Sequence, residues 1–476
     1  MMGSKTMNSS SPQAKRHVVL FPFMSKGHTI PLLHLARLLL RRQVSVTLFT
    51  TAANLPFISH SLTDTSAVII ALPFPENIPG IPAGVESTDA LPSISLFYSF
   101  VLATELMKPH FELALQNLLP RVNFMVSDGF LWWTHDSASK LGFPRFVFYG
   151  MSSYAMAVCA DVAATQILTS PDLGEDDLVT VTSFPWIKVT KNDFEAVFKD
   201  PKSADPLGLD FVMKAQKATE RSSGMIVNSF YEIEAAYADY WNKEWGPKTY
   251  CVGPLCLAYD DQEAKCKPHD HFVHQWLDEK FEKLGAAISV LYVAFGTQAE
   301  ISPQQMKEIA KGLEESEVNF VWVMRKRDQT VDEYLPEGYE ERVRNRGIVV
   351  RDWVDQKEIL KHESVRGFMS HCGWNSVMES VCAEVPILAW PMMAEQPMNA
   401  RMVAEEMKVG LRVERNCDGF VEREEVKKKV KELMEGETGK EVRKKVKEVA
   451  DMARKAVAEC GSSSQALDKL IKETCG

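Results

Sequence analysis

The sequence predicts an α/β protein with two doubly wound parallel sheets, each in a domain of its own. A chain of 476 residues is too long for one ordinary core, so two domains of roughly 200 to 250 residues are expected. Short apolar runs alternate with helical stretches in both halves, which is typical of parallel sheets covered on both faces. The alternation stops in an interval rich in Pro and charge, residues 254–270, and then restarts. We therefore expect an N-terminal domain at 1–253, a linker at 254–275 and a C-terminal domain at 276–461.

The N-terminal domain opens with a buried strand, a loop and a helix. Residues 17–23 are apolar, residues 24–28 form the loop, and helical spacing runs over 30–42. Further strands are expected at 44–50, 68–72, 124–126, 145–149 and 225–228, with helices at 95–118 and 152–168. Residues 170–208, rich in Asp, Pro and Thr, form a looser region.

The C-terminal domain repeats this pattern. An apolar strand at 288–295 leads into Gly296 and Thr297, and a helix follows at 302–316. Further strands are expected at 320–324, 348–350, 365–369 and 386–390. Ligands of doubly wound sheets collect at the carboxyl ends of the strands. The residues that follow strands directly, and so fall at those ends, are Gly27-His28, Ser127-Asp128, Gly296-Thr297, His371 and Glu395.

Charge and cysteine content exclude several classes of protein. The net charge of −10 argues against nucleic acid or an anionic membrane surface as partner, because both need a basic face. No apolar stretch approaches the ~18 residues that a membrane span requires. Nine scattered cysteines indicate a reducing compartment, so we expect a cytoplasmic protein. The Lys- and Glu-rich stretch 421–455 is interpreted as a pair of solvated helices.

The stretch 353–396 is the strongest functional signal in the chain. Its central run, His371-Cys372-Gly373-Trp374-Asn375-Ser376, lies between an apolar strand and a helical stretch. The unpaired backbone amides of a helix start suit a phosphate. The aromatic and polar residues at the two ends of the stretch are Trp353, Gln356, Glu395 and Gln396. No Lys or Arg occurs between His371 and Gln396, so a diphosphate held here is neutralised by amides, hydroxyls and His371, or by basic groups from elsewhere in the fold.

Taken together, these motifs resemble the 44-residue signature of plant family 1 UDP-glycosyltransferases. The matching residues are Trp353-Val354-Asp355-Gln356, His371 to Ser376, Glu379 and Glu395-Gln396, with Gly27-His28, Ser127-Asp128 and Phe295-Gly296-Thr297 outside the signature. The resemblance spans nearly the whole chain and implies a GT-B fold, in which two Rossmann-like domains face each other across a cleft. The donor would bind in the C-terminal domain and the acceptor in the N-terminal one. A final helix, within 462–476, would cross back to the first domain.

The resemblance also assigns the donor-binding residues. They are Thr297, Trp353, Val354, Gln356, His371, Gly373, Trp374, Asn375, Ser376, Glu379, Glu395 and Gln396. Trp353 and the Val354 backbone would hold the uracil, and Gln356 and Glu379 the ribose. The diphosphate would contact His371, Asn375, Ser376 and Thr297, and the sugar would contact Trp374, Glu395 and Gln396. Asp355 stands where the family usually has Pro, which loosens that turn and adds a negative charge near the base pocket.

The catalytic pair is expected to be His28 and Asp128. An imidazole with a pKa near 6.5 is poised to take a proton from an acceptor hydroxyl, and a carboxylate would orient it. Direct displacement would invert the anomeric centre and give a β-glycoside from an α-linked donor. The chain has no Asp-x-Asp triplet, the usual carboxylate handle for a metal-bound nucleotide sugar, so we expect no metal and no cofactor.

The partners are expected to be UDP-glucose and a small acceptor, bound by a monomer. Trp374 and Gln396 resemble the choices of glucose users in this family, while galactose, xylose and rhamnose remain alternatives. The expected acceptor pocket consists of Met24, Phe97, Phe130, Trp132, Tyr149, Met151 and Met393. Aromatic and Met side chains suit flat phenolics such as flavonoids, with terpenoids or hormones as alternatives.

Structural interpretations compete with these roles. His28 and Asp128 could be capping residues, and a non-catalytic nucleotide-sugar binder would not need them. The spacing of Ser376 and Glu379 fits a capping box, in which Glu379 turns back onto the helix backbone. Trp353 could be an ordinary core aromatic. Neither the G-x-G-x-x-G of a nicotinamide oxidoreductase nor the G-x-S-x-G of a serine hydrolase occurs.

Overall fold

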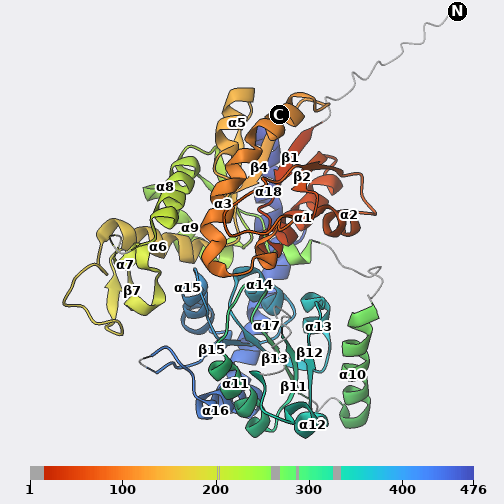
Figure 1. The fold of residues 1–476 in the computed structure, drawn as a ribbon, viewed down its shortest axis with the longest axis vertical. Helices are drawn as coiled ribbons and strands as arrows, with labels where there is room; N and C mark the ends of the chain where they lie inside the picture. Colours follow the sequence, from red (N-terminus) through yellow and green to blue (C-terminus); the bar gives the residue numbers. More distant parts are fainter. Residues whose placement is uncertain are drawn as a thin grey trace, which may run out of the picture.

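The computed structural model describes residues 16–200, 202, 204–258, 268–285, 289–324, 334–416 and 418–475. Two parallel sheets, each accompanied by helices, form two domains that lie one above the other in Figure 1. The strand order is β3-β2-β1-β4-β5-β8-β9 in the N-terminal sheet and β12-β11-β10-β13-β14-β15 in the C-terminal one. The predicted α/β class is confirmed. In each sheet the order reverses beside the first strand, and ligands of such sheets bind at that point.

Most of the strands are short and buried, as expected for sheets covered on both faces, whereas the edge strand β3 is mostly exposed or half-buried. Those of the N-terminal sheet are β1 (His17–Phe21), β2 (Ser45–Thr51), β3 (Val68–Leu72), β4 (Phe124–Asp128), β5 (Arg145–Tyr149), β8 (Gly224–Val227) and β9 (Thr249–Cys251). Those of the C-terminal sheet are β10 (Val290–Ala294), β11 (Asn319–Val323), β12 (Gly347–Val350), β13 (Val365–Ser370), β14 (Ile387–Ala389) and β15 (Gly410–Arg412).

Two helices of the N-terminal domain differ from the prediction. The first, α1 (Lys26–Arg41), begins before residue 30, so His28 lies in its first turn rather than in a loop. The expected helix at 95–118 is divided into α3 (Phe97–Ala103), a 3₁₀ turn and α4 (Lys108–Gln116). Proline is tolerated in the first turn of a helix, and Pro109 takes that place in α4.

The other elements of this domain include a hairpin in the region predicted to be loose. They are α2 (Leu55–Ser61), α5 (Thr134–Leu141), α6 (Ser153–Thr165), β6 (Val179–Val181), β7 (Phe184–Val189), α7 (Ala196–Lys199), α8 (Pro206–Glu220) and α9 (Tyr231–Glu244).

The helices of the C-terminal domain end with one that packs on the other domain. They are α10 (Pro268–Leu284), α11 (Pro303–Ser316), α12 (Tyr339–Val343), α13 (Gln356–Lys361), α14 (Trp374–Cys382), α15 (Gln396–Arg401), α16 (Arg423–Glu435), α17 (Glu437–Val457) and α18 (Ser462–Cys475). Leu467 and Leu470 of α18 share a core with Val18 and Leu20 of β1, and Figure 1 shows the blue helix among the red strands. Of the predicted linker, residues 259–267 lie outside the described residues, and α10 begins inside it. None of the helices in the described ranges is both long and apolar enough for a membrane crossing.

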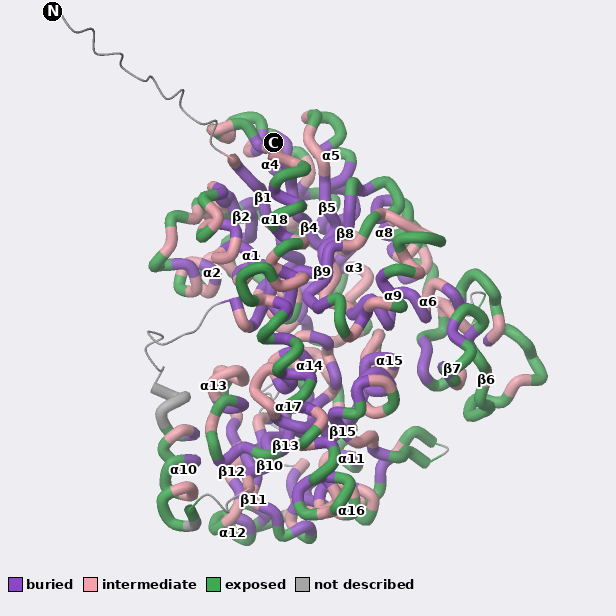
Figure 2. Tube along the Cα trace, turned by 180° about the vertical axis from the view of Figure 1, so that it is seen from behind, coloured by how far each residue is buried: buried purple, intermediate pink, exposed green. Residues whose placement is uncertain are grey.

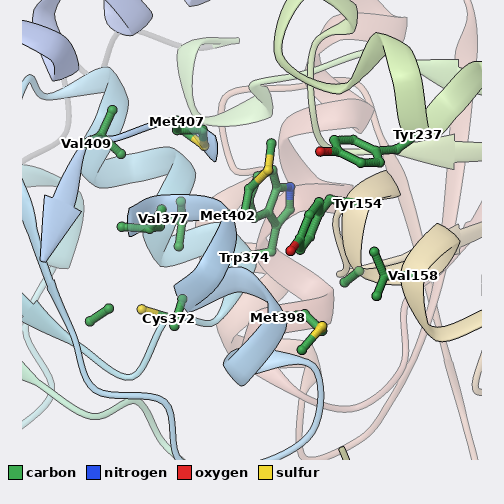
Figure 3. Close-up of a cluster of buried hydrophobic side chains, with 14 of the residues drawn as sticks. Tyr154, Val158, Tyr237, Cys372, Trp374, Val377, Met398, Met402, Met407 and Val409 are labelled. Atoms are coloured by element: carbon green, nitrogen blue, oxygen red, sulfur yellow. The ribbon is translucent and has the colours of Figure 1, made fainter. Parts of the chain in front are cut away.

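The two domains share a buried core. Figure 2 shows buried chain continuing from one domain into the other, and Figure 3 shows Trp374 and Met402 packed beside Tyr154 and Tyr237. Asp193 of the N-terminal domain, 1% exposed, accepts hydrogen bonds from Arg401 and Arg412 of the C-terminal domain at 2.7 and 2.9 Å. Burial raises the pKa of this carboxyl, but the positive charges of the two guanidinium groups have the larger effect. The pKa of Asp193 is therefore lower than usual. The two domains are therefore held together by both apolar and ionic contacts.

Candidate active site

His28 and Asp128 meet at the carboxyl ends of β1 and β4. The Nδ1 atom of His28 lies 2.7 Å from Oδ2 of Asp128, whose side chain is fully buried. The other carboxylate oxygen accepts the backbone N–H of Phe130 at 2.9 Å, which fixes its orientation. Nε2 of His28 makes no hydrogen bond to the described part of the chain, and the side chain is 18% exposed. The structure thus presents one imidazole nitrogen to a ligand and holds the other on a carboxylate.

The charge around His28 favours its protonated form. Burial alone would lower the pKa of the imidazole, but the charge of Asp128, its hydrogen bond and the charge of Glu395 together raise that pKa above 6.5. Glu395 comes from the C-terminal domain, so both domains act on this imidazole. Burial in turn raises the pKa of the Glu395 carboxyl.

Aromatic rings surround His28 on the acceptor side. The ring centroids of Phe23 and Phe130 lie 5.5 and 4.8 Å from that of His28. Phe97 and Phe211 lie 5.9 and 5.1 Å from Phe130. The sequence pointed to Phe97 and Phe130 but missed Phe23 and Phe211. Phe211 lies in α8, far from any strand end, so its position in the sequence gave no signal.

The other residues expected in the acceptor pocket are more scattered. Tyr149 lies 6.4 Å from Phe130, and Trp132 lies 5.9 Å from Phe211, so both border the aromatic group. Met24 is buried in the same core at 2% exposure. Met151 packs against the core shared by the two domains, and Met393 lies on the C-terminal domain before α15.

A cavity of about 1030 Å³ opens between the domains at the ends of β10 and β13. The expected donor-binding residues that line it are Thr297, Trp353, Val354, Gln356, His371, Asn375, Ser376 and Glu379. Gly373, Trp374, Glu395 and Gln396 are not among its lining residues.

His371 is held between two glycines. A Cβ atom at Gly296, where φ is +75°, or at Gly373 would come within 2.7 Å of Nε2 of His371. Burial lowers the pKa of this imidazole to about 4, so it is neutral at pH 7 and acts as a hydrogen-bonding group rather than a cation. Its Nδ1 atom has no hydrogen-bond partner in the described residues.

The residues expected at the ribose lie together. Nε2 of Gln356 donates to Oε2 of Glu379 at 2.7 Å and to Oγ of Ser376 at 2.9 Å. The capping-box interpretation of Ser376 and Glu379 is wrong, because α14 already begins at Trp374 and Glu379 bonds to another helix. Burial, with a smaller contribution from the charge of Asp355, raises the pKa of Glu379 to about 7, although the Gln356 bond opposes the rise.

Asp355, which stands where the family usually has Pro, stabilises this turn through its side chain. Its side chain caps α13 by accepting the backbone N–H groups of Lys357 and Glu358 at 3.1 and 3.4 Å. An N-cap carboxylate satisfies helix amides that would otherwise lack partners. The expected loosening of this turn is therefore offset by the cap.

Trp374 differs from the expectation. Its indole is 1% exposed, packs in the core between the domains, and donates its N–H to the carbonyl of Asn228 at 2.9 Å (Figure 3). The ring therefore points away from the cavity, and only the backbone of Trp374 remains near the helix start. The orientation of the ring is set by a contact between the domains, because the carbonyl that accepts the indole N–H belongs to the N-terminal domain.

Asn375 connects the donor motif to the catalytic turn. Its amide nitrogen donates to the carbonyl of Gly27, the residue before His28, and its amide oxygen accepts from Nδ2 of Asn228 at 2.8 Å. Asn228, 3% exposed, also accepts the N–H of Leu255 at 2.7 Å. Asn228 was missed as a site residue, although it ends the strand expected at 225–228.

The other two residues expected at the sugar, Glu395 and Gln396, lie at the start of α15. Oε1 of Gln396 accepts the backbone N–H groups of Met392 and Met393 at 2.9 and 3.1 Å, so this side chain shapes the turn before the helix. Oε1 of Glu395 accepts a hydrogen bond from Asn399 at 3.3 Å. The charge of Glu395 also raises the pKa of His28.

Known proteins resemble the chain along nearly its whole length. A family model described as "UDP-glucoronosyl and UDP-glucosyl transferase" matches residues 248–451. UDP-glycosyltransferase 90A1 of Arabidopsis thaliana is 55% identical over 471 residues, covering 96% of each chain. UDP-glucose flavonoid 3-O-glucosyltransferase 7 of Fragaria ananassa is 35% identical over 483 residues, again covering 96% of each chain.

Solved structures agree with the fold. UGT73P12 of Glycyrrhiza uralensis, complexed with glycyrrhetinic acid 3-O-monoglucuronide, has a TM-score of 0.86 and 30% identity over 97% of this chain and 96% of its own. UGT2 of Phytolacca americana, complexed with UDP-2fluoro-glucose and pterostilbene, has a TM-score of 0.80 and 28% identity over 97% of this chain and 100% of its own.

Proposed function

Since the chain belongs to the plant family 1 UDP-glycosyltransferases, with the predicted GT-B fold, we propose that it transfers glucose from UDP-glucose to a hydroxyl of a phenolic acceptor. Membership makes it a transferase that moves a sugar from a UDP-sugar to a small acceptor. The choice of glucose, of a phenolic acceptor and of the catalytic residues is our proposal.

One observation supports the proposal most strongly. The His28–Asp128 pair and the donor motif meet in one place, because Asn375 of the motif bonds to the residue next to His28. A base and a nucleotide-sugar site that lie side by side can act on the acceptor oxygen and on the anomeric carbon, the two atoms that the new glycosidic bond joins. A protein that only bound nucleotide sugars would not need the buried carboxylate behind His28.

The proposed reaction is a single displacement. Nε2 of His28 takes the proton of the acceptor hydroxyl as its oxygen attacks the anomeric carbon, and Asp128 stabilises the imidazolium that forms. The bond from the anomeric carbon to the diphosphate oxygen breaks, and UDP leaves with the bonding electrons. Attack opposite the leaving group inverts the α-linked donor to a β-glycoside.

The leaving diphosphate is stabilised at the start of α14. Backbone N–H groups at a helix start have no intrahelical partners and carry a partial positive charge. His371, neutral at pH 7, adds a hydrogen-bonding group there. Preorganised donors of this kind act on the charge that develops as UDP departs.

Glucose and a phenolic acceptor are supported by relatives and by the aromatic wall. A Fragaria relative is named for UDP-glucose and a flavonoid, and a Nicotiana tabacum relative, 33% identical, is named scopoletin glucosyltransferase. In this chain, Phe23, Phe97 and Phe130 form an apolar wall beside His28. Such a wall suits a flat ring that carries its hydroxyl toward the imidazole.

We also propose that the transfer needs no metal ion. The sequence lacks an Asp-x-Asp triplet. In the ranges that the structure covers, no group of three or more His, Cys, Asp and Glu side chains is arranged to hold a metal ion. The positive charge at the diphosphate would then come from amides and from the protein's own side chains.

A paired donor and acceptor screen tests the proposal. Purified protein is incubated with a panel of phenolics, terpenoids and hormones and with UDP-glucose, UDP-galactose, UDP-xylose or UDP-rhamnose, and products are identified by mass. We expect the fastest turnover with UDP-glucose and a phenolic, and an NMR coupling typical of a β-linkage. Faster transfer of another sugar, or an α-linked product, would contradict the donor assignment or the mechanism.

A further inference from the structure

We propose that Lys26 is the cation that pairs with the diphosphate of the donor. This inference rests on the proposed UDP-sugar function and adds a residue from the N-terminal domain to the donor site. It answers a question that the donor motif leaves open, which is how the charge of the diphosphate is balanced.

The C-terminal residues that are expected to contact the diphosphate carry no positive charge. The side chains of Thr297, Asn375 and Ser376 are neutral, and His371 stays neutral because burial lowers its pKa to about 4. The diphosphate of a nucleotide sugar is a dianion. Burying it against neutral groups alone would be costly without a counter-charge.

Lys26 lies where the diphosphate has to pass. Its ammonium nitrogen is 5.6 Å from the ring centroid of Trp353, the residue expected to stack on the base. It also precedes His28, the base expected beside the anomeric carbon, by two residues in the same helical turn. A UDP-sugar that reaches from Trp353 to His28 places its diphosphate between them, within reach of Lys26.

The present contacts of Lys26 are weak enough to exchange. Its Nζ atom is 3.7 Å from Oδ2 of Asp89, beyond hydrogen-bond distance, and the side chain is 32% exposed. Partly exposed pairs at this distance contribute little to stability. The attraction between the ammonium and the indole face is likewise modest. A base stacking on Trp353 would displace the ammonium from the ring and leave it free to pair with phosphate oxygens.

Two other basic residues of the cavity are already held by carboxylates. Arg37 donates to Asp64 at 2.7 and 2.9 Å and to the carbonyl of Ser61 at 2.6 Å. Arg351 donates to Glu340. Lys357, the second residue of α13, also lines the cavity and is the rival that the experiment has to include.

The test measures the binding of UDP and of uridine by calorimetry. We expect Lys26→Gln to weaken UDP binding about tenfold or more, because a charge-assisted contact is lost, and to leave uridine binding within about twofold. Lys26→Arg, which keeps the charge, should retain most of the affinity for UDP. Raising the salt concentration should weaken UDP binding less in Lys26→Gln than in the wild type.

Lys108→Gln is a matched control. Lys108 also begins a helix of the N-terminal domain, is 29% exposed, and lies 3.4 Å from a single carboxylate, that of Asp136. This variant should bind both UDP and uridine as the wild type does.

Three results would overturn the assignment. Lys26→Gln could bind UDP as tightly as the wild type, or lose uridine as much as UDP, which would make Lys26 a support for Trp353. Alternatively, Lys357→Gln could lose UDP affinity while Lys26→Gln does not. A wild-type protein that binds neither ligand would instead contradict the proposed function.

Discussion

Each domain places a histidine at a strand-to-helix corner beside the cleft, and the two imidazoles have opposite electrostatics. His28 follows β1 and bonds to Asp128, which holds its pKa above 6.5 against the effect of burial. His371 follows β13, where burial lowers its pKa to about 4. The same topological position therefore yields an imidazole with a raised pKa in one domain and a neutral imidazole in the other. The difference comes mainly from the buried carboxylate of Asp128, with a smaller contribution from Glu395, rather than from the fold.

Removing the imidazole of His28 should have the largest effect. Without a general base, His28→Ala is expected to lower kcat by roughly 10²- to 10⁴-fold. Binding of UDP should remain, because His28 is not among the lining residues of the donor cavity. Turnover by mass spectrometry and UDP affinity by calorimetry check both parts. Turnover close to that of the wild type would end the assignment of His28 as base.

Asp128→Asn should give a smaller loss together with a shift in pH dependence. The neutral amide no longer stabilises the imidazolium, so kcat should fall roughly 10- to 100-fold. In the wild type, kcat/KM should fall as the pH drops through the raised pKa of His28, which lies above 6.5. Losing the carboxylate lowers that pKa, so the acidic limb of the profile should move to lower pH. An unshifted limb would show that Asp128 is only structural.

His371→Gln should act on donor binding rather than on proton transfer. The imidazole is expected to contact the diphosphate, and replacing this rigid ring with a flexible side-chain amide should misplace the hydrogen bond and weaken UDP binding by about tenfold. Because the pKa of His371 is about 4, the ratio of variant to wild-type affinity should stay constant between about pH 5.5 and 8. A ratio that changes through this range would mean that His371 is charged in the complex.

Asn228→Ala should weaken the contact between the donor motif and the His28 turn, because Asn228 holds the side chain of Asn375. The variant leaves the indole of Trp374 in place but removes the amide partner of Asn375 and the acceptor for Leu255 N–H. Leaving such buried groups unpaired costs about 1–3 kcal/mol, so the midpoint of thermal unfolding should fall. A kcat that falls by more than the folded fraction does would indicate that Asn375 positions the His28 turn. Unchanged stability and rate would remove Asn228 from the site.

Chelation should have the smallest effect of all. If protein groups alone balance the diphosphate, activity should survive EDTA and should not rise on adding Mg²⁺ or Mn²⁺. A strict need for either ion would contradict the metal-free proposal.

Much of this site could be predicted because strand ends are readable in the sequence. Apolar runs followed by polar residues placed His28, Asp128 and His371 at the carboxyl ends of strands, and the structure places them there. The start of α1 was less clear, because Gly27 and Pro31 both weaken a helical pattern, although Pro31 lies inside the helix.

Contacts between the domains could not be predicted in the same way. The direction of the Trp374 ring depends on the carbonyl of Asn228, which is 146 residues away along the chain. The approach of Lys26 to Trp353 likewise exists only when the two domains are assembled. Local spacing carries no information about such pairs, so it identified the donor motif but not the residues that support it.

The most direct test of the account is an NMR titration of the histidine rings, with His28→Gln and His371→Gln variants to assign the two signals. The account predicts that His28 titrates above pH 6.5 and that this midpoint falls in Asp128→Asn, while His371 stays neutral down to about pH 4. A His28 midpoint below 6.5, or a His371 ring that titrates near neutrality, would contradict it.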